Sequence, residues 1–105
     1  MDIDDWRKII DEIDRQLVEL LNERSRCAIE IGKIKRARNL DLYSPDREKE
    51  VIENVKRANR GPLDNDAMQR LFERIIDESR RVERLAAGGA MEHPVLSLDE
   101  EGGRP

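Results

Sequence analysis

The chain has 105 residues, of which 42% are charged and 3% aromatic, and its formal net charge is −4. This length suits one domain and is too short for two ordinary ones. Residues 87–105 carry −3 of the net charge, so the preceding part is nearly neutral and lacks the strong basic excess typical of nucleic-acid binders.

Apolar residues recur at helical spacing from residue 4 to about residue 38, which predicts one long helix capped by Asp4 or Asp5. Arg24 and Lys35 interrupt this apolar stripe. Their separation in the sequence corresponds to about 20° around the helix axis and about 16 Å along it, so both face the interior from the same side. Because an unpaired buried charge is costly, we expect an anionic partner for these two cations.

The length of this helix bears on the assembly of the protein. At about 1.5 Å per residue, it would be roughly 50 Å long. A compact chain of this size has a radius of gyration of about 13 Å. The helix would therefore extend beyond such a globule and leave apolar side chains in water, so we expect a homodimer that forms through it.

A second helix is predicted to begin at Ser44-Pro45-Asp46, with Ser as the N-cap, Pro in the first helical position and Asp in the first turn. Residues 39–43 are expected to form a short linker before it. The helix should run to about residue 60, where Gly61-Pro62 follows.

A third helix is predicted from Asp64, its N-cap, to about residue 85. Its apolar line continues into two polar residues, Ser79 and Glu83. Both are thus expected to point inward, as Arg24 and Lys35 do from the first helix.

The remainder, residues 87–105, lacks a helical pattern and is expected to be a flexible acidic tail that follows a helical domain of residues 1–86. His93 is the single histidine and falls in this tail, so the helical part offers no His-based catalyst, and no metal-ligand cluster is evident. Cys27 is the single cysteine, so no intrachain disulfide is expected. With no signal peptide, membrane-length apolar run or lipidation motif, we expect a cytoplasmic protein that does not contact membranes.

Polar side chains on otherwise apolar lines have two interpretations. Long cations often lie across apolar surface with their charge in water, and a helical Ser can bond its own backbone, so each could be structural. Together they suggest a pocket for a small polyanionic ligand between helices. The residues concerned are Arg7, Arg24, Lys35, Arg47, Glu48, Ser79 and Glu83.

Five charged helical segments follow one another in order, each weak as a signal by itself and fairly specific in combination. The segments are Trp6-Arg7-Lys8-Ile9-Ile10-Asp11-Glu12-Ile13-Asp14, Leu20-Leu21-Asn22-Glu23-Arg24, Ile31-Gly32-Lys33-Ile34-Lys35, Pro45-Asp46-Arg47-Glu48 and Leu71-Phe72-Glu73-Arg74-Ile75-Ile76-Asp77-Glu78-Ser79. Through this ordered set, the sequence resembles the all-helical class of chorismate mutases over about residues 4–85.

This resemblance implies an all-α fold of three helices, an intertwined homodimer with two equivalent sites, and the rearrangement of chorismate to prephenate. That reaction breaks one C–O bond as a C–C bond forms, within one molecule and without a cofactor. Catalysis would then come from holding the reactive conformer and stabilising the charge that develops.

The resemblance also implies roles for individual residues. Arg24 and Arg47, with Arg7 from the partner protomer, would bind the two substrate carboxylates, for which a planar guanidinium is well suited. Lys35 would donate to the ether oxygen, and Glu48 would accept from the ring hydroxyl. The remaining implied contacts are Ser79 at a carboxylate, Ser44 and Glu83 in the pocket, and Val51, Ile31 and Ile76 as apolar walls.

Two positions depart from the expected family pattern. Ser44 stands where many members have Asp, which affects binding strength only. Glu83 stands where bacterial members often have Gln, which donates to the ether oxygen. An ionised Glu cannot donate, so we hypothesise that Glu83 acts in its protonated form, with a pKa raised by burial and opposed by Lys35.

Three other functions remain open from the sequence. An isochorismate pyruvate lyase would share the fold and much of the pocket. A weakly active partner of another shikimate-pathway enzyme, such as the synthase of the first step, would gain activity on binding it. A plain helical dimerisation module would tolerate loss of Arg24 and Lys35 without harm.

Overall fold

The first helix begins at a reciprocal pair of acidic side chains. The computed structural model describes residues 1–88, and α1 spans Ile3–Ala37 within them. Asp2 is the N-cap: its carboxylate accepts from the Asp5 backbone N–H at 2.9 Å, and the Asp5 carboxylate accepts from the Asp2 backbone N–H at 3.0 Å. The prediction of Asp4 or Asp5 as the cap was wrong, because the helix starts ahead of both residues and takes them into its first turn.

The second helix, α2, spans Pro45–Ala58. Ser44 is its N-cap as predicted, but the Ser44 side chain makes no capping hydrogen bond. The helix ends slightly before the predicted boundary because Asn59 adopts an extended backbone conformation. The side-chain Nδ2 of Asn59 donates to the backbone carbonyl of Leu63 at 2.8 Å and to Oδ1 of Asn65 at 2.9 Å. These two bonds stabilise the turn between α2 and the next helix.

The third helix, α3, spans Asn65–Ala86. Asp64 caps it as predicted, since its Oδ1 accepts from the Ala67 backbone N–H at 2.7 Å. The all-α architecture of three helices is thus confirmed, with the long first helix in place. The predicted tail lies outside the described residues from residue 89 onward.

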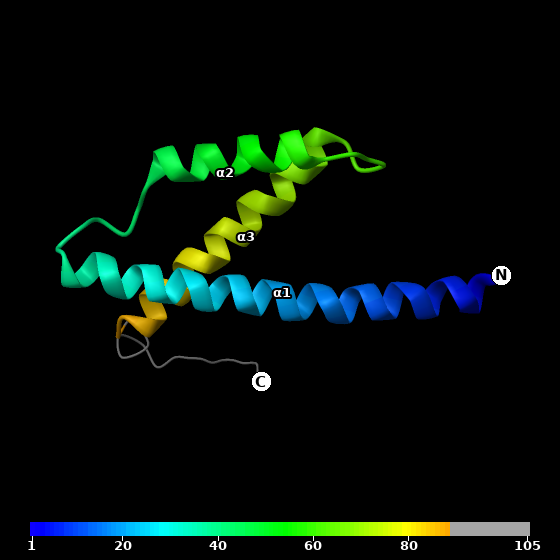
Figure 1. Ribbon diagram of the computed structural model, residues 1–105, viewed down its shortest axis with the longest axis horizontal. Helices are drawn as coiled ribbons and strands as arrows, with labels where there is room; N and C mark the ends of the chain where they lie inside the picture. The colour runs from blue at the N-terminus through cyan, green and yellow to red at the C-terminus, as the bar shows by residue number, and fades with distance from the viewer. Residues whose placement is uncertain (89–105) are drawn as a thin grey trace.

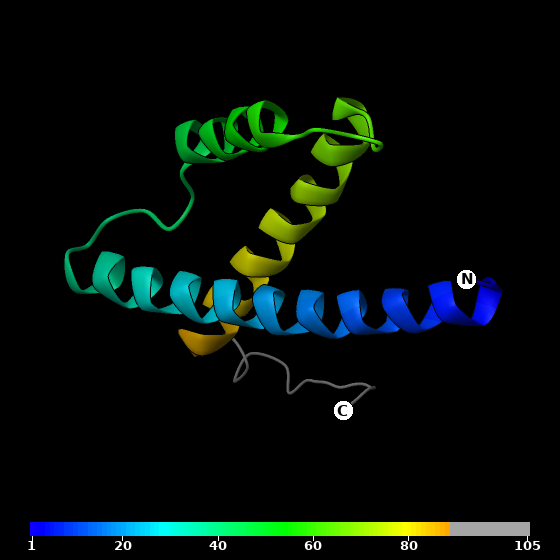
Figure 2. The same cartoon turned by 45° about the vertical axis from the view of Figure 1, so that its right-hand side comes forward.

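The helix α3 connects the other two. It crosses diagonally between α1 and α2 and packs against both, whereas α1 and α2 do not pack on each other within residues 1–88 (Figure 1). Turning the molecule by 45° shows the same arrangement, with the N-terminal half of α1 extending away from the other helices (Figure 2). Within residues 1–88, α3 therefore provides the packing that connects α1 to α2.

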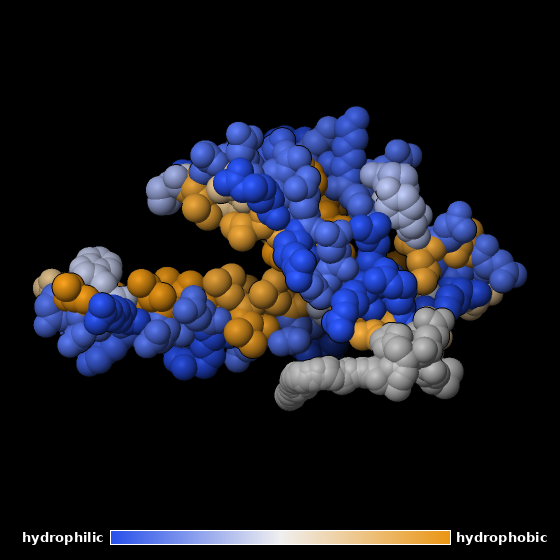
Figure 3. Space-filling view, turned by 180° about the vertical axis from the view of Figure 1, so that it is seen from behind, coloured by the Kyte–Doolittle hydropathy of each residue, from blue (hydrophilic) through white to orange (hydrophobic). Residues whose placement is uncertain are grey.

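Residues 1–88 have almost no hydrophobic core of their own, since Ile76 is their one buried hydrophobic side chain. The radius of gyration of the chain is 16.8 Å, well above the value of about 13 Å for a compact chain of this length. For the stripe residues Trp6, Ile9, Ile10, Ile13 and Leu17 in the N-terminal half of α1, exposed fractions run from 42% for Ile9 to 56% for Trp6. Figure 3 shows a band of apolar surface along the N-terminal half of α1, which faces an open notch. No helix among residues 1–88 is long and apolar enough to cross a membrane.

Candidate active site

A pocket of about 250 Å³ lies where the three helices and the α1–α2 linker meet. Every site residue predicted from the sequence except Arg7 lines it. The lining polar residues among them are Arg24, Lys35, Ser44, Arg47, Glu48, Ser79 and Glu83, and the predicted apolar walls Ile31, Val51 and Ile76 lie there too. Their chemical roles stay predictions, but their common location does not depend on any assumed ligand.

The most buried side chains of the described chain belong to this pocket. Ile76, Ser79 and Glu83 expose 8%, 7% and 9% of their surface, and all three come from one face of α3. Their positions in the sequence are three or four residues apart, so helical geometry aligns them. Two polar groups thus occupy the small interior, where a polar group without a partner is destabilising.

Ser79 has such a partner on α1. Arg24 donates from Nη1 to Oγ of Ser79 at 2.7 Å, and the contact joins α1 to α3. This bond uses one of the five N–H groups of the guanidinium. Arg24 is therefore held in the pocket wall and still has donors for a ligand carboxylate.

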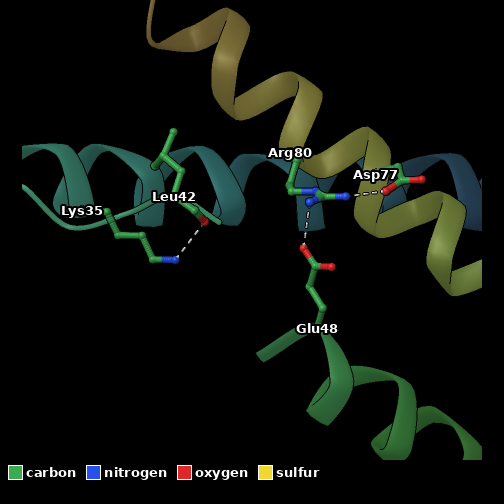
Figure 4. A network of polar contacts seen from close by, with 5 residues as sticks. All are labelled: Lys35, Leu42, Glu48, Asp77 and Arg80. Carbon is green, nitrogen blue, oxygen red and sulfur yellow. Dashed lines mark hydrogen bonds and ion pairs between the residues drawn. The ribbon is translucent and has the colours of Figure 1, made fainter. Parts of the chain in front are cut away.

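Lys35 lies near the C-terminal end of α1. Its Nζ donates to the backbone carbonyl of Leu42 at 3.3 Å, which ties the linker to the end of α1 (Figure 4). An ammonium carries three N–H groups, so this contact leaves others for a ligand in the pocket.

Glu83 lies opposite Gly32 of α1, the one residue of α1 that is buried. Burial raises the pKa of Glu83 above its ordinary value, while Lys35, Arg36, Arg80 and Arg84 lower it by smaller amounts. The net direction is upward. Protonated Glu83 is thus favoured over a wider range of pH than for an exposed glutamate, as the sequence hypothesis requires.

Two predicted arginines lie differently. Arg47 is at the open edge of the pocket, with its side chain 63% exposed and Nη1 2.7 Å from Oε1 of Glu50. Arg7 is near the start of α1, about 25 Å along the helix from Arg24, and its side chain is 72% exposed. The structure thus does not bring Arg7 into the pocket of its own chain.

One charged pocket residue was missed by sequence reasoning. Arg80 of α3 lines the pocket, and its Nη1 lies 3.3 Å from Oε2 of Glu48 on α2 (Figure 4). It follows Ile76 by four residues and precedes Glu83 by three, so its position on the inward face of α3 could have been recognised. Nothing in the local sequence indicates that its partner is on another helix.

Taken together, the fold and the pocket define an all-helical protein with a polar, charged pocket between its helices. Four cations and two carboxyl groups line the pocket: Arg24, Lys35, Arg47 and Arg80, with Glu48 and Glu83. Among residues 1–88, no group of three His, Cys, Asp or Glu side chains could hold a metal ion. The family model of chorismate mutase type II matches residues 6–84, and the chain belongs to this family.

Individual relatives agree with this assignment. The chain is 36% identical over 80 residues to a bifunctional chorismate mutase/prephenate dehydratase of Stutzerimonas stutzeri, covering 71% of this chain and 22% of that protein. It is 25% identical over 79 residues to a chorismate mutase of Methanocaldococcus jannaschii, covering 74% of this chain and 80% of the relative. The chain thus spans about a fifth of the length of the bifunctional relatives and most of the archaeal enzyme.

Solved structures show the same fold. A chorismate mutase from Thermus thermophilus is 33% identical with a TM-score of 0.77, covering 78% of this chain and 93% of that one. A chorismate mutase from Helicobacter pylori in complex with prephenate has a TM-score of 0.76 at 24% identity, covering 82% and 93% of the two chains.

Proposed function

We propose that this chain catalyses the rearrangement of chorismate to prephenate. The observation that supports this most directly is the polar lining of the pocket: buried Ser79 and Glu83 and half-buried Arg24 and Lys35 gather around about 250 Å³. Residues 1–88 have almost no other interior. A structural role alone would favour apolar residues at such positions, because buried charges rarely stabilise a fold.

The charges of the pocket suit a dicarboxylate. Arg24 has free donors beside its bond to Ser79, and Arg47 at the open edge can exchange its exposed contact with Glu50 for a ligand. Exposed ion pairs contribute little stability, so this exchange costs little. Arg24 and Arg47 would bind the two carboxylates, and Ser79 would support one of them.

Lys35 and Glu83 would act at the breaking bond. In the rearrangement an ether C–O bond breaks while a C–C bond forms in the same molecule, and negative charge grows on the oxygen. The ammonium of Lys35 and the protonated carboxyl of Glu83 would both donate hydrogen bonds to that oxygen. Glu48 would accept from the ring hydroxyl, which fixes the substrate in its reactive conformer.

We further propose a homodimer that forms through α1, as expected from the sequence. The exposed apolar stripe of Trp6, Ile9, Ile10, Ile13 and Leu17 supports it. Two α1 helices could pair in antiparallel orientation about a two-fold axis near residues 15–16, about halfway between positions 7 and 24. Arg7 of each copy would then lie beside Arg24 of the other. This arrangement would complete the pocket with a residue that the single chain leaves far from it.

The decisive experiment is the loss of chorismate absorbance with purified protein, run in parallel with isochorismate. We expect turnover of chorismate with prephenate as the product. Pyruvate release from isochorismate without turnover of chorismate would favour the lyase instead. Activity that needs an added enzyme of the same pathway would favour the partner role, for which the fused relatives are the supporting observation. The cytoplasmic location stays a prediction.

A further inference from the structure

Arg80 of α3 makes contacts on three sides. Its Nη1 lies 3.3 Å from Oε2 of Glu48 on α2, and its Nη2 lies 2.7 Å from Oδ1 of Asp77 on α3 (Figure 4). Its Cζ also lies 5.1 Å from the centre of the Tyr43 ring, in the linker between α1 and α2. The guanidinium therefore joins α2, α3 and the linker at the edge of the pocket.

The ion pair between Arg80 and Glu48 differs from the others in the described part of the chain. All the others join residues three or four apart in one helix, whereas this one crosses from α3 to α2. It is also less exposed, with 34% and 28% of the two side chains in contact with solvent. A partly buried contact between separate helices is better placed to fix geometry than an exposed pair.

A further observation concerns Nε of Arg80. This atom is buried and has no hydrogen-bond partner within residues 1–88. Such a group lowers stability, so a smaller or apolar side chain would pack at this position with less cost. The contacts of its two Nη atoms with Glu48 and Asp77 are therefore the feature of arginine that a smaller or apolar side chain could not replace.

We propose that Arg80 is a positioning residue that holds the carboxylate of Glu48 so that it accepts the ring hydroxyl of the substrate. The proposal rests on the proposed function of the pocket. The contact uses Oε2 of Glu48 and leaves Oε1 outside the ion pair, available to the hydroxyl. Asp77 holds the other Nη atom of the guanidinium by an ion pair, and the ring of Tyr43 packs against the face of the guanidinium.

Direct binding of a substrate carboxylate by Arg80 is the competing role. Within residues 1–88, the hydrogen-bond partner of the Arg24 side chain is the neutral hydroxyl of Ser79 at 2.7 Å, whereas both Nη atoms of Arg80 already face carboxylates of the protein. An anionic ligand would have to displace one of them. The two roles predict different coupling between Arg80 and Glu48, so a double-mutant cycle can separate them.

The experiment measures kcat and KM for chorismate with Arg80→Met, Glu48→Gln and the double variant. Glu48→Gln keeps the size of the side chain and ends the ion pair. We expect each single change to lower kcat/KM by about tenfold or more. The kcat/KM of the double variant should be close to that of the less active single variant. Effects that multiply in the double variant would overturn the proposal, because Arg80 would then act independently of Glu48.

Arg81→Met is the matched control. Arg81 is the next residue of α3, its side chain is 60% exposed, and it does not line the pocket. It should retain wild-type kinetics, and an Arg80→Met variant that behaves like it would also overturn the proposal. Arg80→Lys keeps the charge but not the planar fork, so we expect partial recovery. Should Arg80→Met fail to fold, the same cycle is run with Arg80→Lys.

The wild-type measurement separates this proposal from the proposed function. Wild-type protein that leaves chorismate unchanged would contradict the proposed function itself. Active wild-type protein with uncoupled Arg80 and Glu48 would contradict only the positioning role.

Discussion

The carboxyl group of Glu83 lies against Gly32: its Oε2 is 3.2 Å from the position that a Cβ on residue 32 would occupy. This contact joins α3 to α1 at the buried side of the pocket. Glycine within a helix normally lowers stability by about 1 kcal/mol relative to alanine. Its presence in α1 is explained here by the room that it leaves for Glu83.

Gly32→Ala should therefore separate stability from activity. The substitution favours the helix, and the side chain of Glu83 can shift by a few tenths of an ångström. We expect a melting temperature equal to or above that of the wild type, and kcat/KM about three- to tenfold lower because Glu83 is displaced. Glu30→Ala, at an exposed position of α1, is the control. A Gly32→Ala variant with unchanged kinetics would show that activity does not depend on the placement of Glu83.

The pH dependence of the rate should report Glu83. Burial raises its pKa, and the neutral acid is the form that can donate to the ether oxygen. We expect kcat/KM to fall as pH rises through this raised pKa, and Glu83→Gln to flatten that fall. The profile is measured from about pH 4 to 9 for both proteins. Equal pH dependence of the two proteins would rule out a required protonated Glu83.

Stability should change with pH in the same direction. Because the folded-state pKa of Glu83 is above its ordinary value, ionisation opposes folding. The contribution of Glu83 to the free energy of unfolding should therefore be highest at a pH below the ordinary glutamate pKa. It should decrease as the pH rises through the raised pKa of Glu83 in the folded state. Urea unfolding at fixed protein concentration should show the Glu83→Gln variant gaining on the wild type across this range. A constant difference between the two proteins would contradict the assigned pKa direction.

Arg24→Lys tests the need for a planar guanidinium. Arg24 donates to Oγ of Ser79 at 2.7 Å and can still bind a carboxylate through two parallel N–H groups. Lysine keeps the charge but lacks the planar guanidinium that makes this bidentate contact. We expect kcat/KM to fall about a hundredfold with folding retained, measured by the chorismate assay and by thermal unfolding. Arg26→Lys, at an exposed position two residues along α1, should be neutral. Comparable losses in both variants would indicate a general effect of charge on α1.

The proposed exchange of Arg7 across the dimer can be tested by complementation. Arg7→Ala and Arg24→Ala should each be nearly inactive alone. Unfolded and refolded together at equal concentration, about half of the dimers should be mixed, and each mixed dimer would contain one complete site. We expect about a quarter of wild-type activity. Activity no higher than the average of the two separate variants would show that Arg7 and Arg24 serve the same chain.

Local patterns predicted the helices well because each depends on neighbours in the sequence. The end of α1 at Ala37 lies within one residue of the predicted end, since apolar spacing extends along the whole helix. Its start at Ile3 lies two or three residues before the start that an Asp4 or Asp5 cap would give. Its cap was misassigned because Asp2, Asp4 and Asp5 are chemically equivalent in sequence, and only backbone geometry distinguishes them. Ser44 was correctly predicted as the N-cap of α2, but its side chain does not make the capping hydrogen bond. That bond also depends on backbone geometry, which the sequence does not show.

The site could be predicted as far as polar residues interrupted apolar lines. Arg24, Lys35, Ser79 and Glu83 were recognised in this way, and all line one pocket. Arg80 was not, although its spacing from Ile76 and Glu83 places it on the same inward face of α3. Its partner, Glu48, is on another helix, and their contact depends on how α2 and α3 pack.

The sequence by itself determined three helices, their ends to within two or three residues, and the inward polar groups, because helical periodicity is a local property. Only the tertiary structure decided that α3 crosses between α1 and α2, which gathers those groups around one pocket. It also left Arg7 far from the pocket and the stripe of α1 uncovered. These relations depend on packing between residues distant in the chain, which no local pattern encodes.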